Sequence, residues 1–171
     1  MKKLILVIVS IIILSLFIFG ACIGNNNGID PSTPNLGSPI DFELIKTYSD
    51  VGLNVTIRSR VAMATDVDSL QSIIKNESTA QEIFDYFDEE YFKDNNVIFH
   101  FWVNSPGTVS ISATAIYISS DKITIETLTK ELSGEHPDVV YDYGLKALRV
   151  SKDDIGDIRT IEELQKYEII D

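Results

Sequence analysis

The first 22 residues constrain this chain of 171 residues more than any other stretch. Two lysines precede an apolar run, residues 4–19, that only two serines interrupt, and the small residues Gly20 and Ala21 close it. A basic start, an apolar segment and a small-residue exit are typical of a secretory leader. The leader predicts that the rest of the chain is exported, and any fold has to begin after it.

The end of this leader has two interpretations. Phe19-Gly20-Ala21-Cys22 resembles the lipobox of prokaryotic lipoproteins, in which small residues precede a lipid-modified cysteine. The resemblance implies lipidation of Cys22 and removal of a signal peptide, residues 1–21. Alternatively the segment is an uncleaved anchor that extends to about residue 23, because residues 4–23 are long enough to cross the hydrocarbon core. The only cysteine of the chain lies at the lipobox position, which favours the lipoprotein.

Both interpretations predict the same location. Lys2 and Lys3 keep the start of the chain in the cytoplasm, and either two acyl chains or a spanning helix anchors a protein stably. Residues 22–40 form the lipidated cysteine and a flexible linker, because residues 24–39 carry three glycines and three prolines. We therefore expect a single domain, residues 41–171, anchored to the cell membrane on its extracytoplasmic side.

The charge of the chain limits its partners. Cleavage of the leader would lower the number of basic residues from 14 to 12 against 26 acidic ones, which changes the net charge from −12 to −14. A chain this acidic is expected to repel nucleic acid. The charge serves either solubility or the binding of a cationic partner or divalent metal. With Cys22 lipidated no disulfide can form, so an apolar core has to hold the domain together.

The first part of the domain predicts one strand and two helices. Residues 53–63 alternate between apolar and polar side chains, which indicates a strand with one wet face. Asp66 is positioned to cap a short helix that carries Leu70 and Ile73 on one side. Ser78 and Gln81 have the spacing of a capping box, which predicts the start of a second helix.

The second part of the domain is predicted to form strands. Residues 97–103, 108–118, 123–132 and 139–150 are strand-like runs with short connections, which favour antiparallel neighbours. Thr160 and Glu163 form a last capping box and predict a C-terminal helix. The predicted fold is α+β: an antiparallel sheet of about five strands, two helices covering one face, and a short C-terminal helix.

Residues 84–92 form an aromatic and acidic segment that is followed by the strand-like runs. This order is similar to small prokaryotic lipoproteins of unknown function and to the C-terminal domain of a treponemal protease-complex component. The resemblance covers residues 61–152. Ser105-Pro106-Gly107-Thr108 stands where that family carries Gly-Gly-Tyr, and no functional residue is carried over from it.

Two histidines are the only bases of the usual catalytic kind. His100 lies in the middle of a strand-like run beside Trp102, and we interpret it as a hydrogen-bonded residue of a core or sheet face. His136 lies in a loop with Glu135 and Asp138, which suits a ligand or a pH-sensitive contact. The sequence contains no nucleophile elbow, phosphate-binding glycine loop or His-Glu-x-x-His motif.

The sequence predicts no metal site and no cofactor. A cysteine-based site is excluded because Cys22 is alone. Asp153, Asp154 and Asp157 come closest to a hard-cation loop, but they lack the regular alternation of oxygen ligands.

Three functional hypotheses follow. The first is a non-enzymatic, membrane-anchored binding or accessory module of the cell envelope, which contacts an envelope protein through Arg58 and Arg60 on the sheet face opposite the helices. The second is a small hydrolase that uses His136 with nearby carboxylates. The third is a binder of metal or small ligands that uses the acidic loops.

Overall fold

The computed structural model describes residues 36–49, 51, 60–75, 78–105, 107–134 and 142–171. The chain divides into Met1–Asn35 and Leu36–Asp171, and only the second unit is described below. Of the described residues, 58% lie in strands and 20% in helices. No helix among them is long and apolar enough to cross a membrane. The predicted leader and most of the predicted strand at residues 53–63 lie outside the described residues.

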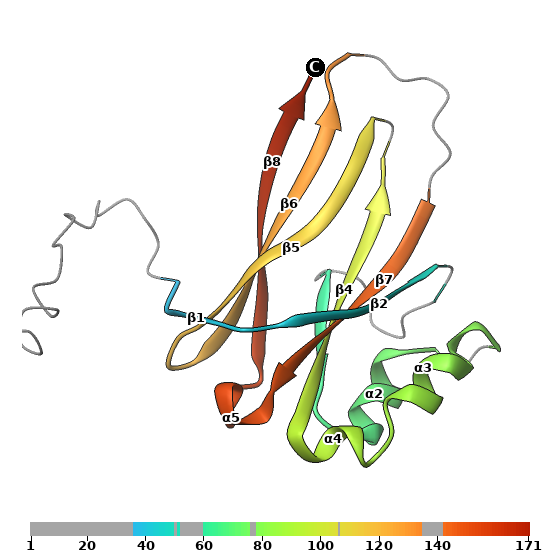
Figure 1. Ribbon diagram of the computed structural model, residues 1–171, viewed down its shortest axis with the longest axis vertical. Helices are drawn as coiled ribbons and strands as arrows, with labels where there is room; N and C mark the ends of the chain where they lie inside the picture. Colours follow the sequence, from blue (N-terminus) through green and yellow to red (C-terminus); the bar gives the residue numbers. More distant parts are fainter. Residues whose placement is uncertain (1–35, 50, 52–59, 76–77, 106, 135–141) are drawn as a thin grey trace, which may run out of the picture. The chain divides into compact units, whose positions relative to one another are not determined.

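The strands form two sheets of four (Figure 1). Sheet A has the order β1-β5-β6-β8 and contains Ser38–Ile40, Thr108–Ile118, Lys122–Leu132 and Thr160–Ile170. Sheet B has the order β2-β7-β4-β3 and contains Glu43–Ser49, Asp142–Ser151, Asn95–Asn104 and Val61–Ala64. The chain passes directly from β1 in one sheet to β2 in the other, and β1 lies in the last residues of the predicted linker (Figure 1).

Four short helices accompany the sheets: α2 (Val67–Ile73), α3 (Gln81–Tyr86), α4 (Tyr91–Asp94) and α5 (Lys152–Ile155). Asp66 caps α2 as predicted, since its carboxylate accepts a hydrogen bond from the backbone N–H of Ser69 at 2.7 Å. The predicted capping box of the second helix was wrong. A 3₁₀ turn at Ser78–Ala80 precedes α3, and Ala80 has no side chain with which to cap it.

Strand β4 divides the interior into two cores because its side chains alternate between two covered faces. Val97 and Phe99 pack with residues of α2 and α3, among them Leu70 and Ile83. The next residue along, Ile98, packs instead between the two sheets, with the apolar residues Val61, Ile116, Ile123, Ile125, Leu148, Val150 and Ile155. An interior strand buried on both faces explains the continuous apolar run from residue 97.

The predicted fold class was wrong, because the strands build two sheets and not one. The prediction assumed that short connections join strands of the same sheet. Instead the chain leaves β6 in sheet A, forms β7 in sheet B, and returns through α5 to β8 beside β6. This route makes the β6–β8 pair parallel, although every other strand pair among the described residues is antiparallel.

The predicted C-terminal helix was also wrong, since Thr160 and Glu163 belong to β8. The segment is rich in glutamate, leucine and lysine, which favour helices locally. Pairing with β6 overrides that preference along the whole strand. Three ion pairs join the outer faces of the two strands: Lys122–Glu162 at 2.6 Å, Lys166–Glu126 at 2.5 Å and Lys130–Glu168 at 3.0 Å.

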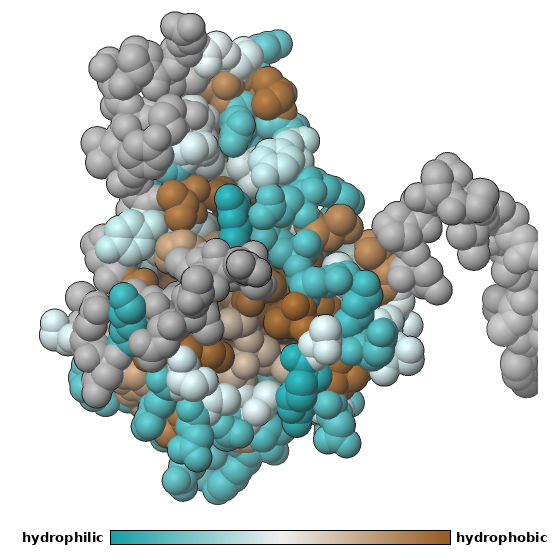
Figure 2. All heavy atoms as spheres, turned by 180° about the vertical axis from the view of Figure 1, so that it is seen from behind, coloured by the Kyte–Doolittle hydropathy of each residue, from teal (hydrophilic) through white to brown (hydrophobic). Residues whose placement is uncertain are grey.

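One close approach requires a glycine in sheet B. A Cβ atom on Gly144 would lie 2.5 Å from the carbonyl oxygen of Tyr48 and 2.7 Å from Cζ2 of Trp102. The indole of Trp102 therefore covers the backbone of β7 between the sheets. On the side of the domain seen in Figure 2, apolar side chains show in the middle of the surface with polar ones around them. Met63, Ile158 and Ile161 are only partly buried against the core between the sheets.

Candidate functional site

A polar pocket of about 440 Å³ lies where the ends of several elements meet. The junction before α2, the start of β4 and the segment around α5 bring its walls together. These elements are far apart in the sequence, so the pocket exists only in the folded domain. Its lining residues are Thr65, Asp66, Asn96, Lys152, Gly156, Asp157 and Arg159.

Asn96 is the unusual member of this lining. Its side chain points to the same side of β4 as Ile98, and only 1% of the residue is exposed. Its amide oxygen Oδ1 has no hydrogen-bond partner among the described residues. A buried acceptor without a donor costs about 1–3 kcal/mol, and native proteins keep few such groups. The pocket therefore contains a buried acceptor that the described part of the chain does not satisfy.

Charges of both signs surround this acceptor. Lys152 donates a hydrogen bond from Nζ to the carbonyl oxygen of Phe92. Arg159 donates from Nη1 to the carbonyl oxygens of Gly156 at 3.1 Å and Ile158 at 3.0 Å, both of them backbone acceptors close to it in the chain. Asp66 and Asp157 add carboxylates to the same lining.

The pKa of the Asp66 carboxyl is lowered from its ordinary value. The hydrogen bond from the backbone of Ser69 is the main cause that lowers its pKa, and the nearby charge of Lys152 acts in the same direction. A second pocket of about 300 Å³ shares Asp66 and Lys152 with the first and extends toward Glu89 and Phe92. Both carboxylates and cations line the two pockets, which suits a ligand that carries both charges.

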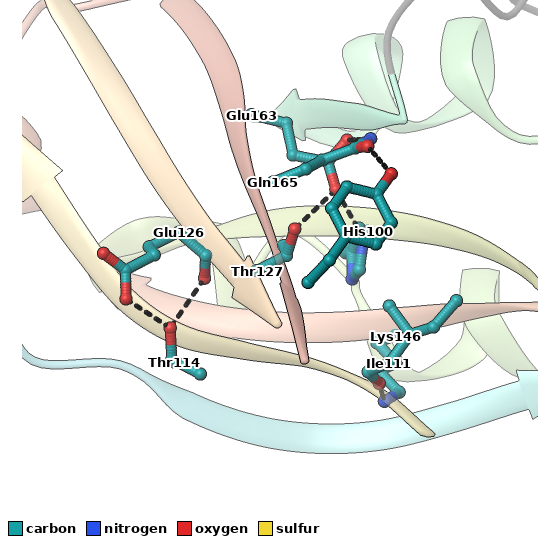
Figure 3. A network of polar contacts seen from close by, with 9 residues as sticks. His100, Ile111, Thr114, Glu126, Thr127, Lys146, Glu163 and Gln165 are labelled. Carbon is teal, nitrogen blue, oxygen red and sulfur yellow. Dashed lines mark hydrogen bonds and ion pairs between the residues drawn. The ribbon is translucent and has the colours of Figure 1, made fainter. Parts of the chain in front are cut away.

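A different polar cluster is buried between the sheets (Figure 3). His100 of β4, which is fully buried, contacts Glu163 of β8 with 3.2 Å between Nε2 and Oε1. The same carboxylate accepts a hydrogen bond from the hydroxyl of Thr127 at 2.8 Å, and Gln165 donates to its other oxygen at 2.8 Å. Tyr167 continues the chain of contacts by donating to the Gln165 side-chain oxygen at 2.6 Å.

The electrostatics of this cluster are dominated by Glu163. Burial raises the pKa of its carboxyl, but hydrogen bonds from His100, Gln165 and Thr127, with the charge of His100, outweigh burial and hold the pKa at about 2. Lys146, opposite His100 on β7, donates to the carbonyl oxygen of Ile111. Burial lowers the pKa of Lys146. The cluster lies between the sheets, and its contacts join β4 of one sheet to β6 and β8 of the other.

The interpretation of His100 as a hydrogen-bonded residue of a sheet face is confirmed. The partner of His100 was missed, because Glu163 was assigned to a helix. The complementary charges along β6 and β8 are the signal in the sequence that could have revealed the pairing of these strands. Asn96 and Lys152 were missed as pocket residues, and nothing in their local sequence marks them.

The structure describes only part of the surface proposed from the sequence. The face of sheet B opposite the helices is buried against sheet A. Arg60 is half-buried, and its carbonyl oxygen accepts a hydrogen bond from the N–H of Phe101 at 2.7 Å. Arg58 and His136 lie outside the described residues, as does Cys22, so their predicted roles stay predictions.

The acidic residues near α5 are separated by the fold. Asp157 lines the pocket with Asn96, whereas Asp154 lines another depression beside Arg149. Among the residues that the structure describes, no group of three or more histidine, cysteine or carboxylate side chains could hold a metal ion.

Comparison with known proteins adds no relative. No known protein family matches the chain, and neither a curated protein nor a solved structure is detectably similar to it. The described residues form a small, mainly-β domain of two sheets with a polar pocket. The lipoprotein and treponemal resemblances remain expectations from the sequence.

Proposed function

We propose that this chain is a membrane-tethered, extracytoplasmic binding module whose polar pocket takes a small zwitterion, such as an amino acid or a peptide end. The single observation that carries the proposal is the buried oxygen of Asn96, unpartnered among the described residues, in a pocket with charges of both signs. That oxygen requires an N–H or O–H donor, and an ammonium group supplies one. Arg159 and Lys152 then face the carboxylate of the ligand, while Asp66 and Asp157 face its positive end.

The proposal predicts stabilisation by amino acids. A ligand present at 100 times its dissociation constant stabilises the folded state by about 2.7 kcal/mol, which raises the melting temperature by several degrees. We expect this shift with a panel of amino acids and dipeptides, measured by thermal unfolding and titration calorimetry. Glucose serves as the uncharged comparison ligand.

Two substitutions locate the site. Asn96→Leu removes the acceptor with little change in volume, and Arg159→Gln removes the cation at the pocket. Each should abolish the ligand-induced shift. The matched control is Lys130→Gln on the outer face of β6, which should leave the shift intact. A shift that survives both pocket substitutions, or that glucose produces and amino acids do not, would reject this site.

The tether is tested separately. The leader and Cys22 support a lipid anchor, and the intact mass of the membrane-extracted protein distinguishes the two anchors. Loss of residues 1–21 with the added mass of a diacylglyceryl group supports the lipoprotein. A full-length mass in the membrane supports the spanning anchor, and recovery of the full-length chain in the cytosol contradicts both.

A further inference from the structure

Among the described residues, strand β8 has no neighbour on its outer side and leaves an open edge on sheet A. It is the last strand of the sheet and, with 11 residues, is as long as its neighbour β6. Sheet B covers only part of it, since β3 packs beside β8 and its upper half extends beyond β3 (Figure 1). In that half Tyr167 is 59% exposed and Ile169 is 63% exposed. A long edge strand with exposed apolar residues is a template for pairing with another strand.

Along this half of β8, every second residue points its backbone N–H and C=O groups toward the open edge. The carbonyl oxygen of Ile170 accepts a hydrogen bond from Ser133, so Ile170 points its backbone toward the end of β6. Successive residues of a strand point their peptide groups to opposite sides. The backbone groups of Gln165, Tyr167 and Ile169 therefore point away from β6, toward the open edge.

The charges of β8 select one partner and one alignment. We propose that two copies of this chain pair edge to edge through β8, antiparallel and centred on Tyr167. This alignment places Lys166 of each copy opposite Glu168 of the other, and Leu164 opposite Ile170. Opposite charges and apolar pairs directly across two strands stabilise a sheet, whereas like charges in those positions destabilise it.

The neighbouring alignments place like charges directly opposite each other. A pair centred on Lys166 places two lysines opposite each other, and a pair centred on Glu168 places two glutamates opposite each other. A pair centred on Gln165 sets Glu162 against Glu168. The alignment on Tyr167 avoids these contacts, and its own like-charge contact sets Glu163 of each copy against the terminal Asp171 of the other. Lys166 and Glu168 keep their own-chain partners Glu126 and Lys130, so the outer ion pairs of the two copies join into one network.

A disulfide tests the alignment directly. In a hydrogen-bonded antiparallel pair the two Cα atoms lie about 5.5 Å apart, a distance that a disulfide bridges readily. Tyr167→Cys in the full-length, membrane-extracted protein should give a disulfide-linked dimer under mild oxidation. Lys130→Cys is the matched control on the adjacent strand, and it should give none beyond the background of Cys22. The wild-type protein measures that background.

Charge exchange tests the register without a new thiol. Lys166→Glu and Glu168→Lys should each weaken the dimer about tenfold, because each turns two attractive contacts into repulsive ones. The double exchange restores opposite charges across the pair and should recover most of the wild-type dimerisation. Sedimentation and light scattering of the full-length protein in detergent measure both effects.

Several outcomes would overturn the pairing. A monomer at all concentrations does so, as does a dimer that is indifferent to both single exchanges. A Tyr167→Cys variant that cross-links only to a different protein would show that β8 accepts another strand and not a second copy. The pairing does not depend on the polar pocket, so it stands or falls independently of ligand binding.

Discussion

Two buried polar residues on the same face of β4 differ in the hydrogen-bond partners of their side chains. His100 and Asn96 point toward the space between the sheets, and Ile98 separates them. His100 meets Glu163 from the opposite sheet, and Thr127 and Gln165 complete the contacts of that carboxylate. Asn96 is equally buried, yet its amide oxygen has no partner among the described residues.

The comparison distinguishes a buried polar group that contacts the opposite sheet from one for which we propose a ligand as the partner. At His100 the chain supplies a partner for Nε2, although Nδ1 has none among the described residues, and the cluster joins β4 to β6 and β8. At Asn96 the interior opens into a pocket, and the described residues supply only one side of the contact. We infer that the first site contributes to the stability of the domain and that the second contributes to binding. Three substitutions along this face of β4 and opposite it test the inference.

The largest effect is expected from the apolar residue between the two sites. Ile98 is fully buried and pairs with Met63 and Leu148 on the neighbouring strands. Ile98→Ala leaves a cavity in the core between the sheets and should lower the free energy of unfolding by about 3–4 kcal/mol. Chemical denaturation measures the loss. Val103→Ala, at the exposed end of the same strand, is the control and should cost less than about 1 kcal/mol.

Loss of the Glu163 carboxylate should have the next largest effect, and its sign depends on pH. The pKa of Glu163 is about 2 in the folded domain and 4.5 when unperturbed. A lowered pKa in the folded state means that the stabilisation is complete above pH 4.5 and is lost as the pH falls toward 2. The shift corresponds to about 3 kcal/mol. Glu163→Gln should therefore destabilise the domain by about 2–3 kcal/mol at about pH 7.

The same substitution should flatten the acid dependence between pH 4.5 and 2, measured by denaturation at a series of pH values. Glu162→Gln is the matched control, because Glu162 is adjacent on β8 but pairs with Lys122 on the exposed outer face. It should change stability by less than about 1 kcal/mol. An unaltered acid slope in Glu163→Gln would show that the buried cluster does not couple folding to protonation.

The sequence contained enough information for several of the strands, but not for β1, β2 and β8 or for the assembly of the two sheets. The runs at residues 97–103, 108–118 and 123–132 are strands in the structure because alternation and β-branched residues report burial directly. The division into two sheets depends on which faces cover each other, and local patterns do not contain that information. Segment 160–170 shows most clearly where local sequence fails to predict secondary structure. Its residues favour a helix, but they pair with β6, which carries complementary charges, and form a strand.

The buried polar residues divide in the same way into one that the sequence could assign and one that it could not. A mid-strand histidine could be assigned to a sheet face from its neighbours alone, and the structure confirms this for His100. Asn96 could not be identified, because an asparagine before a strand usually indicates a turn. Only the convergence of β4 with the segments around Asp66 and Lys152 makes it a pocket residue.

The smallest change in stability is expected at Asn96, and it decides the comparison. Asn96→Leu replaces an unpartnered buried amide by an apolar group of similar shape, and such replacements are nearly neutral or stabilising. We expect the free energy of unfolding without ligand to stay within about 1 kcal/mol of wild type, while the stabilisation by amino acids disappears. His100→Leu is the counterpart, and it should cost about 3 kcal/mol because it removes the contact between His100 Nε2 and the buried carboxylate of Glu163. If Asn96→Leu costs as much as His100→Leu, Asn96 is a structural residue like its neighbour on β4, and the pocket loses its basis as a binding site.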